Sequence, residues 1–122
     1  MRGGRHLIAE HPQGSEMWKM PAWTRLVAEW PLAWTVIHQC AAGLRGPKTR
    51  HPIKKPTEFW ASDPALLAHI KGFRCDGPHA HSQLGAREAG APAEKAKDAA
   101  RWPLRLCQGL AKGCEDVLRS EH

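Results

Sequence analysis

Four cysteine and histidine side chains have the residue types and local spacing that could bind a zinc ion. Cys75, His79 and His81 lie close together in the sequence, and Cys40 stands at the end of an apolar run further back. Zinc in proteins takes tetrahedral sets of Cys thiolates and His nitrogens. The alternative is a small, buried, apolar Cys40 with both histidines exposed in a loop. The uncommon spacing by itself favours this simpler interpretation, and no other cofactor is indicated.

A second group of residues carries positive charge on a long loop with many prolines and glycines. The loop covers residues 43–56 and holds five basic residues, namely Arg45, Lys48, Arg50, Lys54 and Lys55. Such a loop could contact the phosphates of DNA or RNA, and the formal net charge of +6 favours polyanionic partners in general. The commoner case is a solvated basic loop, so the sequence leaves both interpretations open.

The elements that must position these residues indicate a small α/β fold. Short β-favouring runs near residues 5–10, 34–40 and 57–61 predict about three strands. Apolar residues at helical spacing predict a helix over residues 21–30. We expect the first two strands to be parallel neighbours that this helix joins by a right-handed crossover, with 34–40 as the central strand. The result would be a partial Rossmann-like sheet flanked by helices.

The remaining segments predict a mainly helical end to the chain. Residues 75–92 form an irregular connection that contains Cys, His and Gly, and residues 93–121 have a helical pattern that Pro103 interrupts or kinks. The 122 residues form one small or truncated domain, whose sheet-and-helix half covers residues 5–62. Because no stretch is long and apolar enough to cross a membrane and no secretory signal is seen, we expect reduced thiols in an intracellular compartment.

Three short motifs follow one another along the chain. They are Ala9-Glu10-His11-Pro12 with Ser15 and Trp18, then His38-Gln39-Cys40-Ala41-Ala42-Gly43, then Lys55-Pro56-Thr57-Glu58-Phe59-Trp60-Ala61-Ser62. In this order they resemble the later part of the catalytic domain of cytosine-5 DNA methyltransferase-like proteins, above all the divergent forms of phages and retroelement polyproteins. Cys75, His79, His81 and the run from Arg101 to Cys107 also resemble the retroelement forms.

The resemblance implies a role for Glu10, which the sequence pattern puts at the end of its strand. Glu10 matches the family's glutamate, which binds the ring edge of a flipped-out cytosine and can share a proton with the ring nitrogen. In the family, a glycine-rich loop for S-adenosylmethionine and a Pro-Cys nucleophile precede this glutamate. The nine residues before Glu10 contain neither, and none of the four cysteines matches the nucleophile.

We therefore expect a truncated or degenerate, retroelement-derived methyltransferase-like fragment without activity of its own, for which a missing N-terminal half would be a partner. Because the nucleophile and the S-adenosylmethionine motifs are absent from this chain, the sequence leaves open whether it is an enzyme and favours that it is not. The alternative is a small zinc-stabilised module that binds nucleic acid through its basic loop. A third interpretation is a protein with no defined activity.

Overall fold

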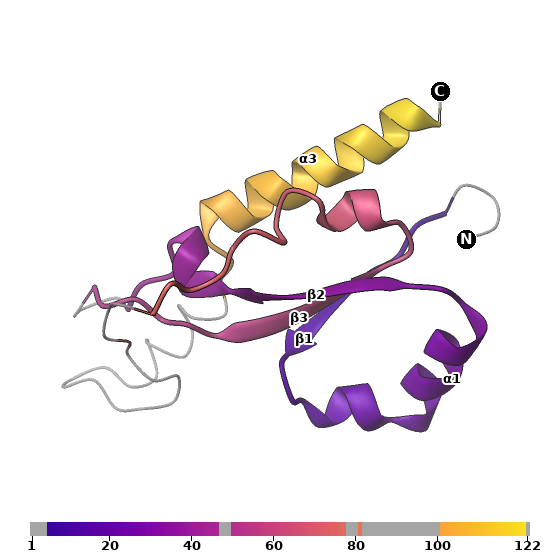
Figure 1. Ribbon diagram of the computed structural model, residues 1–122, viewed down its shortest axis with the longest axis horizontal. Helices are drawn as coiled ribbons and strands as arrows, with labels where there is room; N and C mark the ends of the chain where they lie inside the picture. The colour runs from indigo at the N-terminus through magenta and orange to yellow at the C-terminus, as the bar shows by residue number, and fades with distance from the viewer. Residues whose placement is uncertain (1–4, 47–49, 78–80, 82–100, 122) are drawn as a thin grey trace.

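A three-stranded antiparallel sheet lies at the centre of the molecule (Figure 1). The computed structural model describes residues 5–46, 50–77, 81 and 101–121. The strands are β1 (Ile8–Pro12), β2 (Ala33–His38) and β3 (Pro56–Ala61), in the order β1-β3-β2. The prediction of a mixed α/β fold with three short strands at these places is confirmed.

The central strand is β3, and the predicted strand order was wrong. Phe59 of β3 pairs antiparallel with Glu10 of β1 on one side and with Thr35 of β2 on the other. β1 and β2 therefore run in the same direction, but they are not neighbours, and 34–40 is an edge strand rather than the central one. The chain folds back after β2 through a hairpin, a connection that suits antiparallel pairing. The Rossmann-like arrangement is not confirmed.

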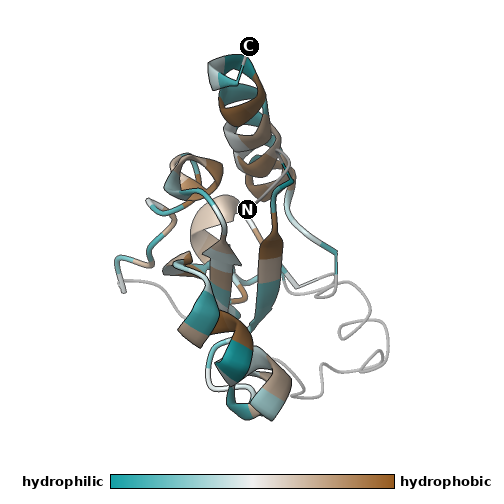
Figure 2. Cartoon of the chain, turned by 90° about the vertical axis from the view of Figure 1, so that its right-hand side faces the viewer, coloured by the Kyte–Doolittle hydropathy of each residue, from teal (hydrophilic) through white to brown (hydrophobic). Residues whose placement is uncertain are grey.

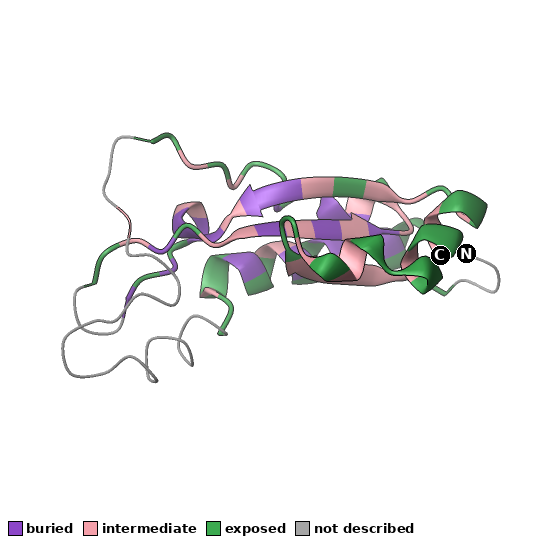
Figure 3. Ribbon diagram, turned by 90° about the horizontal axis from the view of Figure 1, so that it is seen from below, coloured by how far each residue is buried: buried purple, intermediate pink, exposed green. Residues whose placement is uncertain are grey.

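Helices lie on both faces of the sheet. Figure 1 shows α3 (Leu104–Ser120) and the short 3-10 helix η4 (Pro64–Leu67) on one face, and α1 (Pro21–Glu29) with η2 (Glu16–Lys19) on the other. Between the sheet and α3 lies the main core, formed by Ile37, Phe59, Leu66, Leu67, Ile70, Leu106, Leu110 and Val117. Polar and apolar colours alternate around α3 in Figure 2, and buried segments gather on the strands in Figure 3. The amphipathic α3 thus supplies much of the core.

Tryptophans cover the opposite face of the sheet. The Trp60 ring on β3 stacks on Trp34 of β2, with ring centroids 5.6 Å apart, and meets Trp23 of α1 edge-on at 5.4 Å. Trp18 of η2 also contacts Trp23, at 4.9 Å. Because these rings fill the space between α1 and the sheet, α1 is held in place although none of its residues is fully buried.

Most local start signals hold, while the predicted end of the first strand does not. The Ser15 hydroxyl accepts a hydrogen bond from Met17 N and caps η2, and Pro21 begins α1. β1 continues past the predicted end at Glu10 to Pro12, because β1 is an edge strand, where a proline without an N–H is tolerated. α3 begins directly after Pro103, the residue at which the sequence predicts an interruption, and residues 93–100 of the predicted helical tail lie outside the described residues. No helix in the described part of the chain combines the length and apolar character needed to cross a membrane.

Candidate metal centre

A one-turn helix at the end of β2 positions Cys40. This helix, η3, covers Gln39–Ala42, and Gly43 closes it with a left-handed φ of 104° that favours glycine. The fully buried Gln39 anchors η3, because its backbone N–H donates to the Lys54 carbonyl at 2.6 Å and its side-chain Nε2 donates to Thr57 Oγ1 at 2.9 Å. Cys40 is therefore held in a fixed place, with only 6% of its surface exposed.

The chain after η4 brings Cys75 to the same place. His38 N donates to the Phe73 carbonyl at 2.8 Å, and Arg74 Nη1 donates to the Val36 carbonyl at 2.6 Å. Cys75 N then donates to His38 Nδ1 at 2.8 Å. These bonds lay residues 73–75 along the outer edge of β2 and cover an edge that would otherwise be open.

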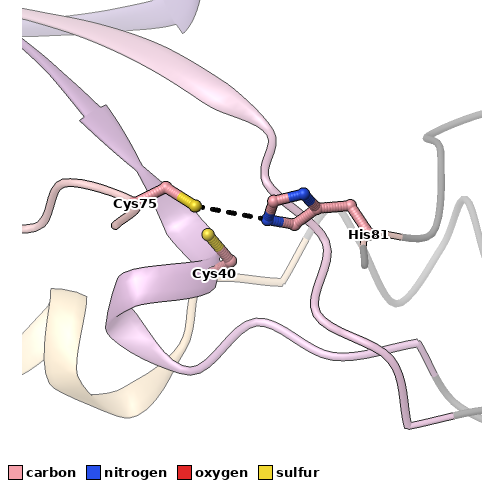
Figure 4. Close-up of side chains that lie close together, drawn as sticks. All are labelled: Cys40, Cys75 and His81. Carbon is pink, nitrogen blue, oxygen red and sulfur yellow. Dashed lines mark hydrogen bonds between the residues drawn. The ribbon is translucent and has the colours of Figure 1, made fainter. Parts of the chain in front are cut away.

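Cys40, Cys75 and His81 form a compact cluster of soft ligand atoms (Figure 4). Cys75 Sγ and His81 Nε2 lie 3.4 Å apart, and the three ligand atoms all lie within 4.8 Å of one another. A tetrahedral zinc with sulfur at about 2.3 Å and nitrogen at about 2.0 Å holds such atoms roughly 3.5–3.8 Å apart. The donor types and their spacing thus fit a zinc ion, with three ligands from the described chain.

The thiol of Cys40 is not poised for nucleophilic attack. Burial, and after it a hydrogen bond with Cys75 and the charge of that residue, together raise its pKa to about 11. A nucleophilic cysteine needs a lowered pKa, so Cys40 suits core packing or metal binding instead. The pKa of the neighbouring His38 is lowered, first by burial and then by the positive charges of Lys54 and Arg74.

The structure brings together three of the four predicted metal ligands, and the fourth lies outside the described residues. Cys40, Cys75 and His81 converge, whereas His79 lies outside the described residues. His38 was not predicted as a site residue, although its ring accepts the Cys75 N–H and so orients the cluster. The one available signal was its position two residues before Cys40 in the predicted strand 34–40, because alternate residues of a strand share a face. In the structure β2 ends at His38 and Cys40 lies in η3.

The described residues of the loop 43–56 form a hairpin, here called the basic hairpin. Its stem is closed by a bridge between Arg45 and Pro52 and by the buried pair Leu44 and Ile53. The exposed basic side chains on it are Arg45, Arg50 and Lys54; Lys55 is half-buried, and Lys48 lies outside the described residues. Burial lowers the pKa of Lys55, and the charge of Glu10 opposes that shift.

Glu10 itself stands apart from the metal cluster. It lies in the middle of β1 opposite Phe59, where it is half-buried, and its charge acts on Lys55. No protein-family model, curated protein or solved structure matches this chain.

Proposed function

We propose that this protein is a small zinc-stabilised module that binds nucleic acid through its basic hairpin. The observation that carries the proposal is the convergence of Cys40, Cys75 and His81 from separate segments onto one point. An ion bound there ties η3 to the chain that follows η4, so it closes long loops and stabilises the fold. His79, two residues before His81 in the sequence, is the candidate for the fourth ligand.

The ligand set favours a structural over a catalytic zinc. Structural sites are rich in cysteine, whereas catalytic sites keep an open position for water. Cys40 is almost fully buried, and its hydrogen-bonded neighbour Cys75 is half-buried. A zinc ion would supply the positive charge that two adjacent thiolates require.

A backbone hydrogen bond connects the basic hairpin to the proposed zinc site. The Lys54 carbonyl accepts the Gln39 N–H, one residue before Cys40, so the metal would fix the base of the hairpin. Arg45, Arg50 and Lys54 are exposed from this base, where guanidinium and ammonium groups can contact phosphate oxygens. Binding through these contacts should weaken steeply as salt is raised.

Metal analysis of the purified protein with matched cysteine variants tests the proposal. We expect one zinc per chain and a melting temperature that falls when a chelator removes the ion. Cys75→Ser should lose the zinc, whereas Cys107→Ser, at an exposed cysteine on α3, should keep it. Equal zinc content in the two variants would contradict the assignment of the ligands.

A relationship to cytosine-5 DNA methyltransferase-like proteins is a second proposal. One observation favours it: the three motifs meet at the same end of the sheet, where Pro12 pairs with Thr57 and His38 pairs with Pro56. The sequence contains no Pro-Cys dipeptide, so this chain alone should neither transfer a methyl group nor bind S-adenosylmethionine. Calorimetry that detected micromolar S-adenosylmethionine binding would contradict the idea of an inactive relative.

A further inference from the structure

A cavity of about 370 Å³ lies between the basic hairpin and the start of α3. Three arginines line it: Arg45 and Arg50 from the hairpin, and Arg101 from the residues that lead into α3. No carboxylate lines the cavity among the described residues, and none of the three arginines forms an ion pair within the described part of the chain. Three like charges around one cavity repel one another unless an anion lies between them.

The beginning of α3 adds to the positive potential of this cavity. Arg101, Trp102 and Pro103 all line it, and the 17-residue α3 begins at the next residue, Leu104. Pro103 at the N-cap supplies no side-chain hydrogen bond, and the first turn contains no acidic residue. The first N–H groups of a helix and its dipole favour an anion. The helix start and the three guanidinium groups thus select the same kind of ligand.

The size and lining of the cavity indicate more than an inorganic ion. A volume of about 370 Å³ is within the range of small-molecule sites and is much larger than one phosphate requires. Trp102 is 37% exposed, and its ring is held edge-on against the buried Phe59 at 5.8 Å. A fixed, partly exposed indole can pack against a sugar or stack on a base.

We propose that this cavity binds the phosphate of a nucleotide, either a free nucleotide or the 5′-phosphate end of a single strand. Arg45, Arg50 and Arg101 bind the phosphate oxygens, and Trp102 contacts the attached nucleoside. The inference rests on the proposed function, because it gives the nucleic-acid-binding hairpin a specific phosphate site.

The test compares phosphorylated and unphosphorylated probes on the zinc-loaded full chain. AMP and adenosine are titrated by calorimetry, and labelled oligothymidine with a 5′-phosphate or a 5′-hydroxyl is followed by fluorescence anisotropy. Arg101→Gln should weaken binding of the phosphorylated probe about tenfold or more, since a charge-assisted contact is lost. Arg25→Gln is the matched control, because it removes the same charge from an exposed position on α1, on the other face of the sheet.

Each outcome decides between the sources of the phosphate or overturns the proposal. Binding of AMP but not adenosine supports a free-nucleotide site, and a preference for the 5′-phosphate oligonucleotide supports a strand end. If the phosphate makes no difference to either probe, or if Arg25→Gln weakens binding as much as Arg101→Gln, the cavity is not a phosphate site. If the cavity fails this test but Lys54→Gln still weakens oligonucleotide binding, the proposed function of the basic hairpin stands without the phosphate site. The zinc content is measured separately and depends on neither result.

Discussion

The pKa of Cys40 predicts how zinc affinity depends on pH. Burial and the neighbouring Cys75 together raise the pKa of this thiol to about 11. Zinc binds the thiolate, so the proton must leave when the metal binds. At pH 7 this thiol is therefore almost entirely protonated in the metal-free protein, because each pH unit below the pKa lowers the ionised fraction tenfold. The apparent affinity should therefore rise at least about tenfold per pH unit, or about a hundredfold from pH 6 to pH 8.

A competition assay with a zinc-chelating indicator measures this slope directly. The indicator's own proton binding is corrected at each pH, and Cys107→Ser serves as the control that keeps the full slope. Cys40→Ala should bind zinc more weakly and with a slope lower by about one proton. An affinity for zinc that does not change between pH 6 and pH 8, or an unchanged slope in Cys40→Ala, would refute the assignment of Cys40 as a ligand.

Three further predictions concern packing, pH and salt. Gly113→Ala should destabilise the zinc-loaded protein by roughly 1–3 kcal/mol in thermal melts, because the new Cβ would lie 2.6 Å from the Leu66 carbonyl oxygen and helix propensity returns only about 1 kcal/mol; equal or higher stability would show that the helices can separate freely. A hydrogen bond from His69 lowers the pKa of Asp116 below 3.8, so Asp116→Asn should lower the melting temperature at neutral pH, with the difference vanishing as the pH falls below 3.8 and the carboxylate is protonated; a difference that is the same at pH 7 and pH 3 would contradict this. Lys54→Gln should lower the slope of log Kd against log salt for a single strand by about 0.7, as expected for one lost phosphate contact, and an unchanged slope would exclude that contact.

Short sequence patterns predicted the helices and strands. The order of the strands depends on contacts between residues that are far apart in the sequence, which such patterns do not record. Ser15 and Pro21 mark helix starts through their own hydrogen-bonding and backbone chemistry, which short sequence windows record. The central place of β3 depends on Phe59 pairing with strands that are distant in sequence on both sides. A run of six residues cannot specify such partners, and the alternation of buried and half-buried residues along β3 is visible only after both neighbours are known.

The candidate site was likewise predictable in its residue types but not in its long-range contacts. The residue types of Cys40, Cys75 and His81 predicted zinc chemistry, but their meeting depends on the bonds of His38 with Phe73 and with Cys75, which join segments far apart in the chain. The cavity was missed for the same reason. Arg101 lies about fifty residues after Arg50, so no local pattern connects it to Arg45 and Arg50.

X-ray absorption at the zinc edge tests the central claim most directly. The zinc-loaded protein should show two sulfur ligands at about 2.3 Å and nitrogen or oxygen ligands at about 2.0 Å, as two cysteines and at least one histidine require. Cys75→Ser should reduce the sulfur count, and Cys107→Ser should leave it unchanged. A spectrum with only nitrogen and oxygen ligands would contradict the proposed centre at Cys40, Cys75 and His81.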